Sequence, residues 1–363
     1  MDVRFLLFAV DSARKMSTIE RPQIQLRLAR RVPVIFASLM LLSMSLFATP
    51  IVHAQTVVTR IQVGTEPLGI AVDRVTEQVY VANFQSGTVS VINEKTFAVI
   101  ATISGFSGPV GVAVNVKTDR VYVTNLFSNT ITMINDKDHK PEATITGVLC
   151  PKGIDVNPLT DTIYAANECT HTVYVIDGST NTIVTQVPVV AASQSPESVG
   201  VNPQTNRIYV TDSGGFAVTV IDGSTNTVIT NIPVPGYQCA VGIGIGVNPL
   251  TNRIYTSDYN GEVNVIDGSS NTLIGDIPVG SLPCGVGVDS VTNLLYVANQ
   301  GSNSVSVIDA STNTVIATVP NVAMGPPTTA NVYGPLGVTV DDHRNLVYTS
   351  NSANSQVTVI SCA

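Results

Sequence analysis

Short runs of Val, Ile, Ala and Thr alternate with turns rich in Gly, Asn, Asp and Pro from residue 56 to the end of the chain. Several runs, such as Val173–Ile176, are apolar at both odd and even positions. A strand that is apolar on both sides is typical of a sheet covered on both faces. The pattern therefore predicts an all-β domain made of sheets packed face to face.

The runs recur in groups of four, which predicts four strands per repeat. The first resembles Gly111–Asn115, the second starts with Tyr122, the third resembles Val218–Ile221 and the fourth resembles Thr227–Ile232. Proline closes the fourth run in several repeats, at Pro188, Pro233, Pro278 and Pro320. Proline cannot donate to a β-ladder, so the fourth strand is expected at the outer edge of each sheet.

One tetrapeptide pattern, Tyr followed by two small or β-branched residues and then Asn or Asp, identifies the second strand of every repeat. The seven copies end in Asn83, Asn125, Asn167, Asp212, Asp258, Asn299 and Asn351. Their tyrosines are 42, 42, 45, 46, 41 and 52 residues apart. A period in the forties without helical segments is typical of a β-propeller. We therefore predict a seven-bladed β-propeller of four-stranded antiparallel blades.

The two ends of the repeat array complement each other. The chain finishes on a third strand, Val357–Ile360, and the repeats are preceded by an isolated fourth strand, Thr56–Val63. The N-terminal strand should therefore complete the last blade and close the ring, which removes an unpaired edge.

The first 54 residues have a different character. Arg27, Arg30 and Arg31 precede an uncharged run from 32 to 48, and a small-x-Ala site follows at 52–54. This order is typical of a secretory signal peptide, here with a long basic leader, although an uncleaved membrane anchor of the same length is the alternative. We predict residues 1–54 as the signal peptide and 55–363 as the propeller. The propeller would then be periplasmic, secreted or at the cell surface, with no membrane span after cleavage.

The charge balance differs between these two parts. The net charge is −8, and residues 1–54 contribute seven basic and three acidic side chains, or +4, so the remainder carries −12. An acidic domain repels phosphate backbones, which makes nucleic acid an unlikely partner.

The string Tyr122-Val123-Thr124-Asn125, in repeats of this length, resembles the YVTN family of β-propeller repeat proteins, and the resemblance covers residues 56–361. It implies an exported or surface-associated propeller. Relatives have been linked to cell-surface layers and some to nucleic-acid binding, which the acidic balance here disfavours. The resemblance is specific for the fold and implies no particular activity.

Length variation is confined to one side of the predicted disc. The interval from Asn93 to Asn115 is 22 residues, whereas that from Asp309 to Asp341 is 32, and it contains a fourth-to-first connection. The long connections are 189–197, 235–241 and 321–334. Insertions on one face of a repeat scaffold often mark a binding face, although drift in tolerant loops is the alternative. The side chains expected there are Glu66, Lys152, Glu168, His171, Glu197, Tyr237, Met324 and Tyr333.

Four of the five cysteines fall in loops of this same face. We predict the disulfides Cys150–Cys169 and Cys239–Cys284, with Cys362 unpaired; free thiols are the alternative, because sequence does not fix connectivity. Glu168, Cys169 and His171 share one loop, but three donors there are a weak metal signal, and no metal or cofactor is predicted.

The seven Asn/Asp residues that end the tetrapeptides form a predicted ring, either lining a funnel or, as such residues usually do, satisfying local backbone groups. The chain has no Trp, no Cys-x-x-Cys-His and no Gly-x-Ser-x-Gly, so no catalytic residues are assigned. We expect a scaffold that binds a protein or surface polymer on the long-loop face. Alternatives are a lactonase- or lyase-type enzyme, a subunit of a periplasmic redox complex, or a structural component of a surface layer.

Overall fold

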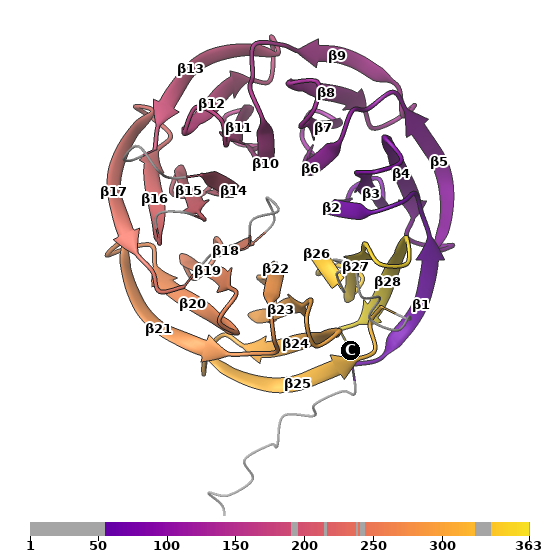
Figure 1. The fold of residues 1–363 in the computed structure, drawn as a ribbon, viewed down its shortest axis with the longest axis vertical. Coiled ribbons are helices and arrows are strands. Elements are labelled where there is room, and N and C mark those ends of the chain that lie inside the picture. Colours follow the sequence, from indigo (N-terminus) through magenta and orange to yellow (C-terminus); the bar gives the residue numbers. More distant parts are fainter. Residues whose placement is uncertain are drawn as a thin grey trace, which may run out of the picture. The chain divides into compact units, whose positions relative to one another are not determined.

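The computed structural model describes residues 55–189, 195–213, 216–236, 239, 244–323 and 335–362. They form a ring of seven four-stranded antiparallel sheets and no helix (Figure 1). The all-β, seven-bladed prediction is confirmed. The predicted signal peptide lies outside the described residues. Within the described part of the chain there is also no helix of the length and apolarity needed to cross a membrane.

In six blades the strands run outward from the axis in sequence order, and in the seventh β26, β27 and β28 do so and β1 is outermost. The innermost strands are β2 (Pro67–Asp73), β6 (Pro109–Asn115), β10 (Pro151–Asn157), β14 (Pro196–Asn202), β18 (Ile245–Asn248), β22 (Pro283–Asp289) and β26 (Pro335–Asp341). The second strands are β3 (Gln78–Asn83), β7 (Arg120–Asn125), β11 (Thr162–Asn167), β15 (Arg207–Asp212), β19 (Arg253–Asp258), β23 (Leu294–Asn299) and β27 (Leu346–Asn351).

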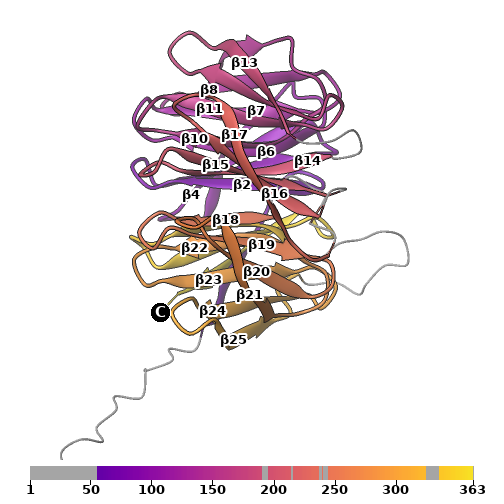
Figure 2. The same cartoon turned by 90° about the vertical axis from the view of Figure 1, so that its left-hand side faces the viewer.

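The third strands are β4 (Thr88–Asn93), β8 (Thr130–Asn135), β12 (Thr172–Asp177), β16 (Ala217–Asp222), β20 (Glu262–Asp267), β24 (Ser304–Asp309) and β28 (Gln356–Ser361). The outer strands are β5 (Ala98–Ser104), β9 (Pro141–Ile145), β13 (Thr182–Pro188), β17 (Thr227–Pro233), β21 (Thr272–Pro278), β25 (Thr314–Pro320) and β1 (Val57–Gln62). Figure 2 views the ring from its edge, with β17 and β21 crossing the front. Prolines end several outer strands, as expected for edge strands.

The ring closes as the sequence predicts. β1 pairs antiparallel with β28, with Arg60 opposite Thr358, and completes the sheet β1-β28-β27-β26. The closing strand joins the two ends of the repeat array by a full ladder and leaves the seventh blade without a missing strand.

Adjacent blades interlock through the tetrapeptide tyrosines. All seven are fully buried. Tyr122 Oη in the second blade approaches the carbonyl of Gly178 in the third at 3.5 Å, and Tyr80 donates to Asp136 in the same way one seam earlier. The apolar clusters likewise span pairs of blades, since Tyr80 and Val89 pack with Val121. The repeated Tyr therefore fixes each blade against its successor.

The two faces of the ring differ. The variable face carries the second-to-third and fourth-to-first connections, whereas the uniform face carries four-residue turns such as 74–77 and 94–97. The uniform turns are capped by the strand-ending acid or amide: Asp73 Oδ1 accepts hydrogen bonds from Val75 N at 2.7 Å and Thr76 N at 3.1 Å. This local pairing explains why these turns keep one length.

Candidate functional site

The centre of the variable face is covered by an apolar cluster that we call the axial plug. Its members come from four blades and from the connection that precedes β18: Leu68, Val110, Cys239, Cys284 and Leu336. All five are at most 7% exposed. Four of the five directly follow the proline that begins the inner strand of their blade, as Cys284 follows Pro283. These side chains pack against one another at the variable-face ends of the inner strands of four adjacent blades.

Large apolar and aromatic side chains surround the axial plug. Phe84, Leu126 and Tyr259 pack against it, and each directly follows the last residue of a tetrapeptide. Phe84 also contacts Phe127, with ring centroids 5.2 Å apart. Phe127 is 65% exposed. An aromatic ring that is held by a neighbour and still presented to solvent is a feature of binding surfaces.

In the third and fourth blades, the position directly after the inner-strand proline carries a charged residue. Lys152 and Glu197 stand where four other blades have plug residues, and Lys152 Nζ lies 3.0 and 2.8 Å from the two carboxylate oxygens of Glu197. Glu168 lies 3.0 Å from the same Nζ, and Ser213 Oγ donates to Glu197 at 3.2 Å. The structure thus brings together three residues that the sequence placed on this face.

Burial affects the protonation of Glu197 and Lys152. It raises the pKa of Glu197 to about 7, although Lys152 opposes the rise. Burial also disfavours the charge of Lys152, but its two carboxylate neighbours outweigh this and raise its pKa. Lys152 is therefore charged at neutral pH, and Glu197 titrates close to neutral pH.

The two predicted disulfides are confirmed. Cys150–Cys169 and Cys239–Cys284 have Cα separations of 5.6 and 5.2 Å, and Cys362 is free and buried. Cys169 is exposed beside the charged trio, whereas both members of the second bridge belong to the axial plug. Two disulfides indicate an oxidising, non-cytoplasmic compartment.

The other predicted site residues lie away from the charged trio or outside the described residues. Glu66 is half-buried, and its carbonyl accepts from Phe84 N at 2.9 Å at the rim of the plug. His171 lies in the loop of Cys169, where its Nδ1 is buried without a hydrogen-bond partner. Tyr237, Met324 and Tyr333 fall outside the described residues. In the part of the chain that is described, the donors close enough to share a metal ion are Asp341, Asp342 and His343, on the uniform face.

The strand-ending Asn/Asp ring is interior. Its seven members are at most 2% exposed. Asn83 Nδ2 donates to Thr88 and Ser90 at 3.0 Å each, and Asn299 Nδ2 donates to Ser304 and Ser306 at 3.2 and 2.9 Å. These bonds cross to the third strand of the same blade, so the side chains hold the second-to-third hairpin.

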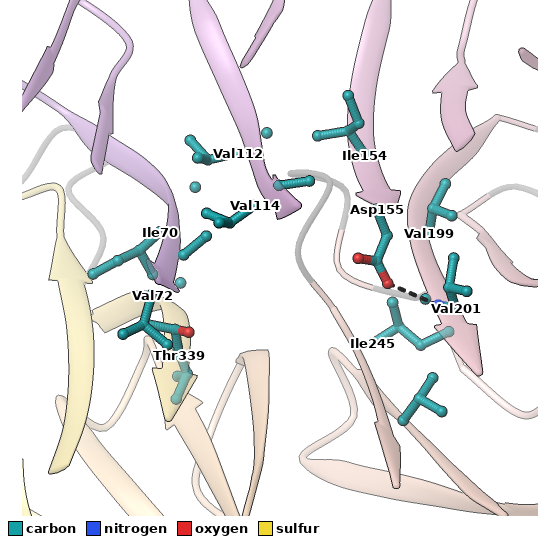
Figure 3. A pocket seen from close by; sticks show the side chains of 18 of the residues that line it. Ile70, Val72, Val112, Val114, Ile154, Asp155, Val199, Val201, Ile245 and Thr339 are labelled. Atoms are coloured by element: carbon teal, nitrogen blue, oxygen red, sulfur yellow. Dashed lines mark hydrogen bonds between the residues drawn. The ribbon is translucent and has the colours of Figure 1, made fainter. Parts of the chain in front are cut away.

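A tunnel of about 320 Å³ runs along the axis beneath the plug, lined by inner strands (Figure 3). Val112, Ile154 and Val201 are among its lining residues, and it reaches Arg74 on the uniform face. Asp155 is the one carboxylate among its described lining residues; its oxygens accept from Val156 N and Val201 N, both at 2.8 Å. Burial raises the pKa of Asp155 to about 6.

Sequence reasoning missed the residues that build the centre of the variable face. Phe84, Phe127 and Ser213 were not singled out, nor were the apolar members of the plug. A signal was available, because these residues occupy fixed repeat positions: one directly after the inner-strand proline, another directly after the tetrapeptide, and for Phe127 one residue further on. Comparing these positions across blades would have found both the plug and the charged trio.

Comparison with known proteins supports the fold. No family model matches the chain, and no curated protein matches it. Among solved structures, the hydrazine synthase of Kuenenia stuttgartiensis is similar, with a TM-score of 0.70 over 84% of this chain and 98% of that chain. The sequence identity is 18%, so the likeness shows a shared propeller fold and no more.

Proposed function

We propose that this chain is an exported, YVTN-type propeller that binds a partner protein or surface polymer on its variable face. The observation that carries the proposal is the exposed Phe127 ring held against Phe84 over the axial plug. Exposed aromatic anchors on a rigid base are typical of interface hot spots.

The composition of the face favours a macromolecule over a small substrate. The axial plug fills the centre with buried side chains, and further apolar residues are exposed around it: Leu149, Phe216 and Leu282, at 44, 40 and 41%. Glu168 and Lys152 add a polar sector on one side. A surface that combines exposed apolar side chains with a polar sector has the composition of a protein interface.

The test is capture of partners from an extract of the producing cell, with the full chain as bait. Phe127→Ser should lose the captured partner, whereas Val291→Ser should keep it, because Val291 is 69% exposed but lies on the uniform face. Deletion of residues 321–334 should also weaken capture if that long loop contributes. Equal capture by both serine variants would contradict the proposal.

A second candidate is a subunit of a periplasmic redox complex. The similarity in fold to a hydrazine synthase chain favours it over the other enzymatic alternatives. Native mass spectrometry of the captured assembly distinguishes the two: a haem- or metal-carrying partner identifies a redox complex, and a cofactor-free partner identifies a scaffold. Assembly of the chain with itself in the absence of any partner, measured by light scattering, would instead support the surface-layer alternative.

A further inference from the structure

The wall of the axial tunnel is formed by one edge of each inner strand. In the described part of the chain, every inner strand pairs only with the second strand of its own blade, so its other edge faces the axis. The N–H and C=O groups on that edge have no ladder partner. Most of the lining side chains are aliphatic, such as Ile70, Val112 and Val201. The tunnel therefore offers a ligand both backbone hydrogen-bonding groups and apolar contacts.

One position of this wall differs in the third blade. It is the inner-strand residue opposite the tetrapeptide tyrosine, and in the third blade Asp155 occupies it, opposite Tyr164. The other six blades have small, uncharged residues there: Ala71, Ala113, Gly200, Gly246, Gly287 and Thr339. In the fourth blade, a Cβ on Gly200 would lie 2.9 Å from a methyl carbon of Val247, so a longer side chain has no room. The carboxyl group is thus a departure from the repeat.

The Asp155 carboxyl group can accept more hydrogen bonds than it receives. Figure 3 shows it reaching from β10 toward Val201 on β14. Oδ1 accepts one bond from Val156 N and Oδ2 accepts one from Val201 N, both at 2.8 Å. A carboxylate offers about four acceptor sites, so about two remain. Asp155 is half-buried and lines the tunnel, which makes its side chain accessible to a ligand there.

Within the described residues, no basic side chain pairs with Asp155. Arg74 is the other charged residue of the described lining, and its Nη1 lies 3.0 Å from Asp342. Lys152 lies on the same strand as Asp155, but it is bound by Glu197 at the variable face. An ionised carboxylate that is confined without a counter-charge is costly. A cationic ligand in the tunnel would supply that counter-charge.

We propose that the tunnel binds a small primary alkylammonium ion, with its ammonium group on Asp155 and its carbon chain along the aliphatic wall. The ammonium group has three N–H donors, which the carboxylate and the free carbonyl groups of the inner strands can accept. A volume of about 320 Å³ is at the lower end for ligand pockets, so the ligand is small. The described lining has no aromatic ring, which disfavours a quaternary ammonium ion, and no Cys or His, which disfavours a transition metal.

The experiment titrates the full chain with butylammonium chloride by isothermal titration calorimetry at pH 8, in a buffer without amines. We expect saturable binding at millimolar concentration or below, and no binding of butanol, which has the same carbon chain without the charge. Asp155→Asn should weaken butylammonium binding by about 10- to 100-fold, because it removes the charge-assisted hydrogen bonds. Asp276→Asn, at an exposed position on β21, should leave binding unchanged.

Two further variants make the test specific, and circular dichroism checks that each keeps the fold. Val114→Phe fills part of the tunnel while keeping Asp155, and it should also weaken butylammonium binding. Phe127→Ser alters only the variable face and should leave this binding unchanged, so this proposal and the proposed function can fail separately. The proposal is wrong if butylammonium gives no saturable heat, or if wild type and Asp155→Asn bind it equally. Displacement of butylammonium by equimolar K⁺ or Ca²⁺ would also overturn it, because the site would then be one for inorganic cations.

Discussion

Lys152 Nζ contacts both carboxylate oxygens of Glu197 across the seam between the third and fourth blades, at 3.0 and 2.8 Å. The two side chains are 13 and 2% exposed, so the pair is removed from water at the centre of the variable face. A buried pair of this kind costs desolvation energy that each partner recovers only through the other. Removing one partner should therefore be far more damaging than removing both.

We predict that Lys152→Met destabilises the propeller by about 3–5 kcal/mol, because Glu197 is left buried without its cation. This corresponds to a fall in Tm on the order of 6–10 °C for a domain of this size. The deficit should widen as pH rises through the Glu197 pKa of about 7, since ionised Glu197 then has no counter-charge. Thermal melts between pH 5 and 8 measure both effects.

The control is the double variant Lys152→Met with Glu197→Leu. Replacing a buried pair by apolar residues is often neutral, so it should recover most of the lost stability. If Lys152→Met alone melts like the wild type at every pH, the pair contributes nothing to the seam.

The two disulfides should differ in accessibility and in their effect on stability. Cys150–Cys169 closes 19 residues and includes the exposed Cys169, whereas Cys239–Cys284 closes 45 residues inside the axial plug. The loss of either should cost about 3–4 kcal/mol, with the larger loss for the longer loop. Stepwise reduction followed by alkylation and mass spectrometry should label Cys150 and Cys169 first. Simultaneous labelling of all four would contradict this order.

Repetition explains why the fold could be predicted so fully. Seven copies of one pattern average out local ambiguity, and the blade count and the closing strand β1 follow from positions counted along the chain. The counting also placed the four cysteines on one face, although it did not fix their pairing. The strand-ending Asn/Asp ring is the instructive contrast. Its regularity allows a lined funnel, although such residues usually satisfy local backbone groups. Only the bonds from Asn83 to Thr88 and Ser90 show that these side chains contact the third strand.

The contacts at the centre of the variable face follow from no local pattern, because their members come from different blades at one repeat position each. Lys152 and Glu197 are 45 residues apart in sequence. No local pattern indicates that Lys152 bonds Glu197 or that Phe84 meets Phe127. Such pairs are set by the angle between blades, which the sequence of one repeat does not contain.

Glycine in the inner strand is required by the close approach of neighbouring blades. A Cβ on Gly111 would lie 2.6 Å from the carbonyl oxygen of Lys152 in the next blade. We predict that Gly111→Ala destabilises the protein by about 1–3 kcal/mol or more, because both backbones must move apart. Denaturant melts measure the change.

Gly275 is the matched control. It lies in the outer strand β21, and a Cβ there meets nothing within 4 Å, so Gly275→Ala should be neutral or stabilise by about 0.4–1 kcal/mol. Equal losses at both positions would show that the cost arises from the strand conformation and not from the crowding of inner strands.

Asp155 should make stability fall as pH rises through the weakly acidic range. Burial raises its pKa from 3.8 to about 6, so between these values the folded state binds more protons than the unfolded state. Below this window the carboxyl group is protonated in both states; above it, the cost of holding a charge in the tunnel is complete. That cost is on the order of 1–3 kcal/mol, since the group is partly exposed to the tunnel.

Asp155→Asn removes the titrating group while keeping an acceptor for Val201 N. We therefore expect the Tm of the variant, relative to the wild type, to rise by about 2–6 °C between pH 4 and pH 7. The change of Tm with pH is more informative than Tm at any one pH. The Asn amide loses the bond from Val156 N at every pH, which shifts the Tm of the variant without changing its dependence on pH. Asp276→Asn, at an exposed position on β21, controls for the loss of one negative charge. A difference that stays constant with pH would show that Asp155 remains charged in the tunnel without penalty, held by its two backbone donors.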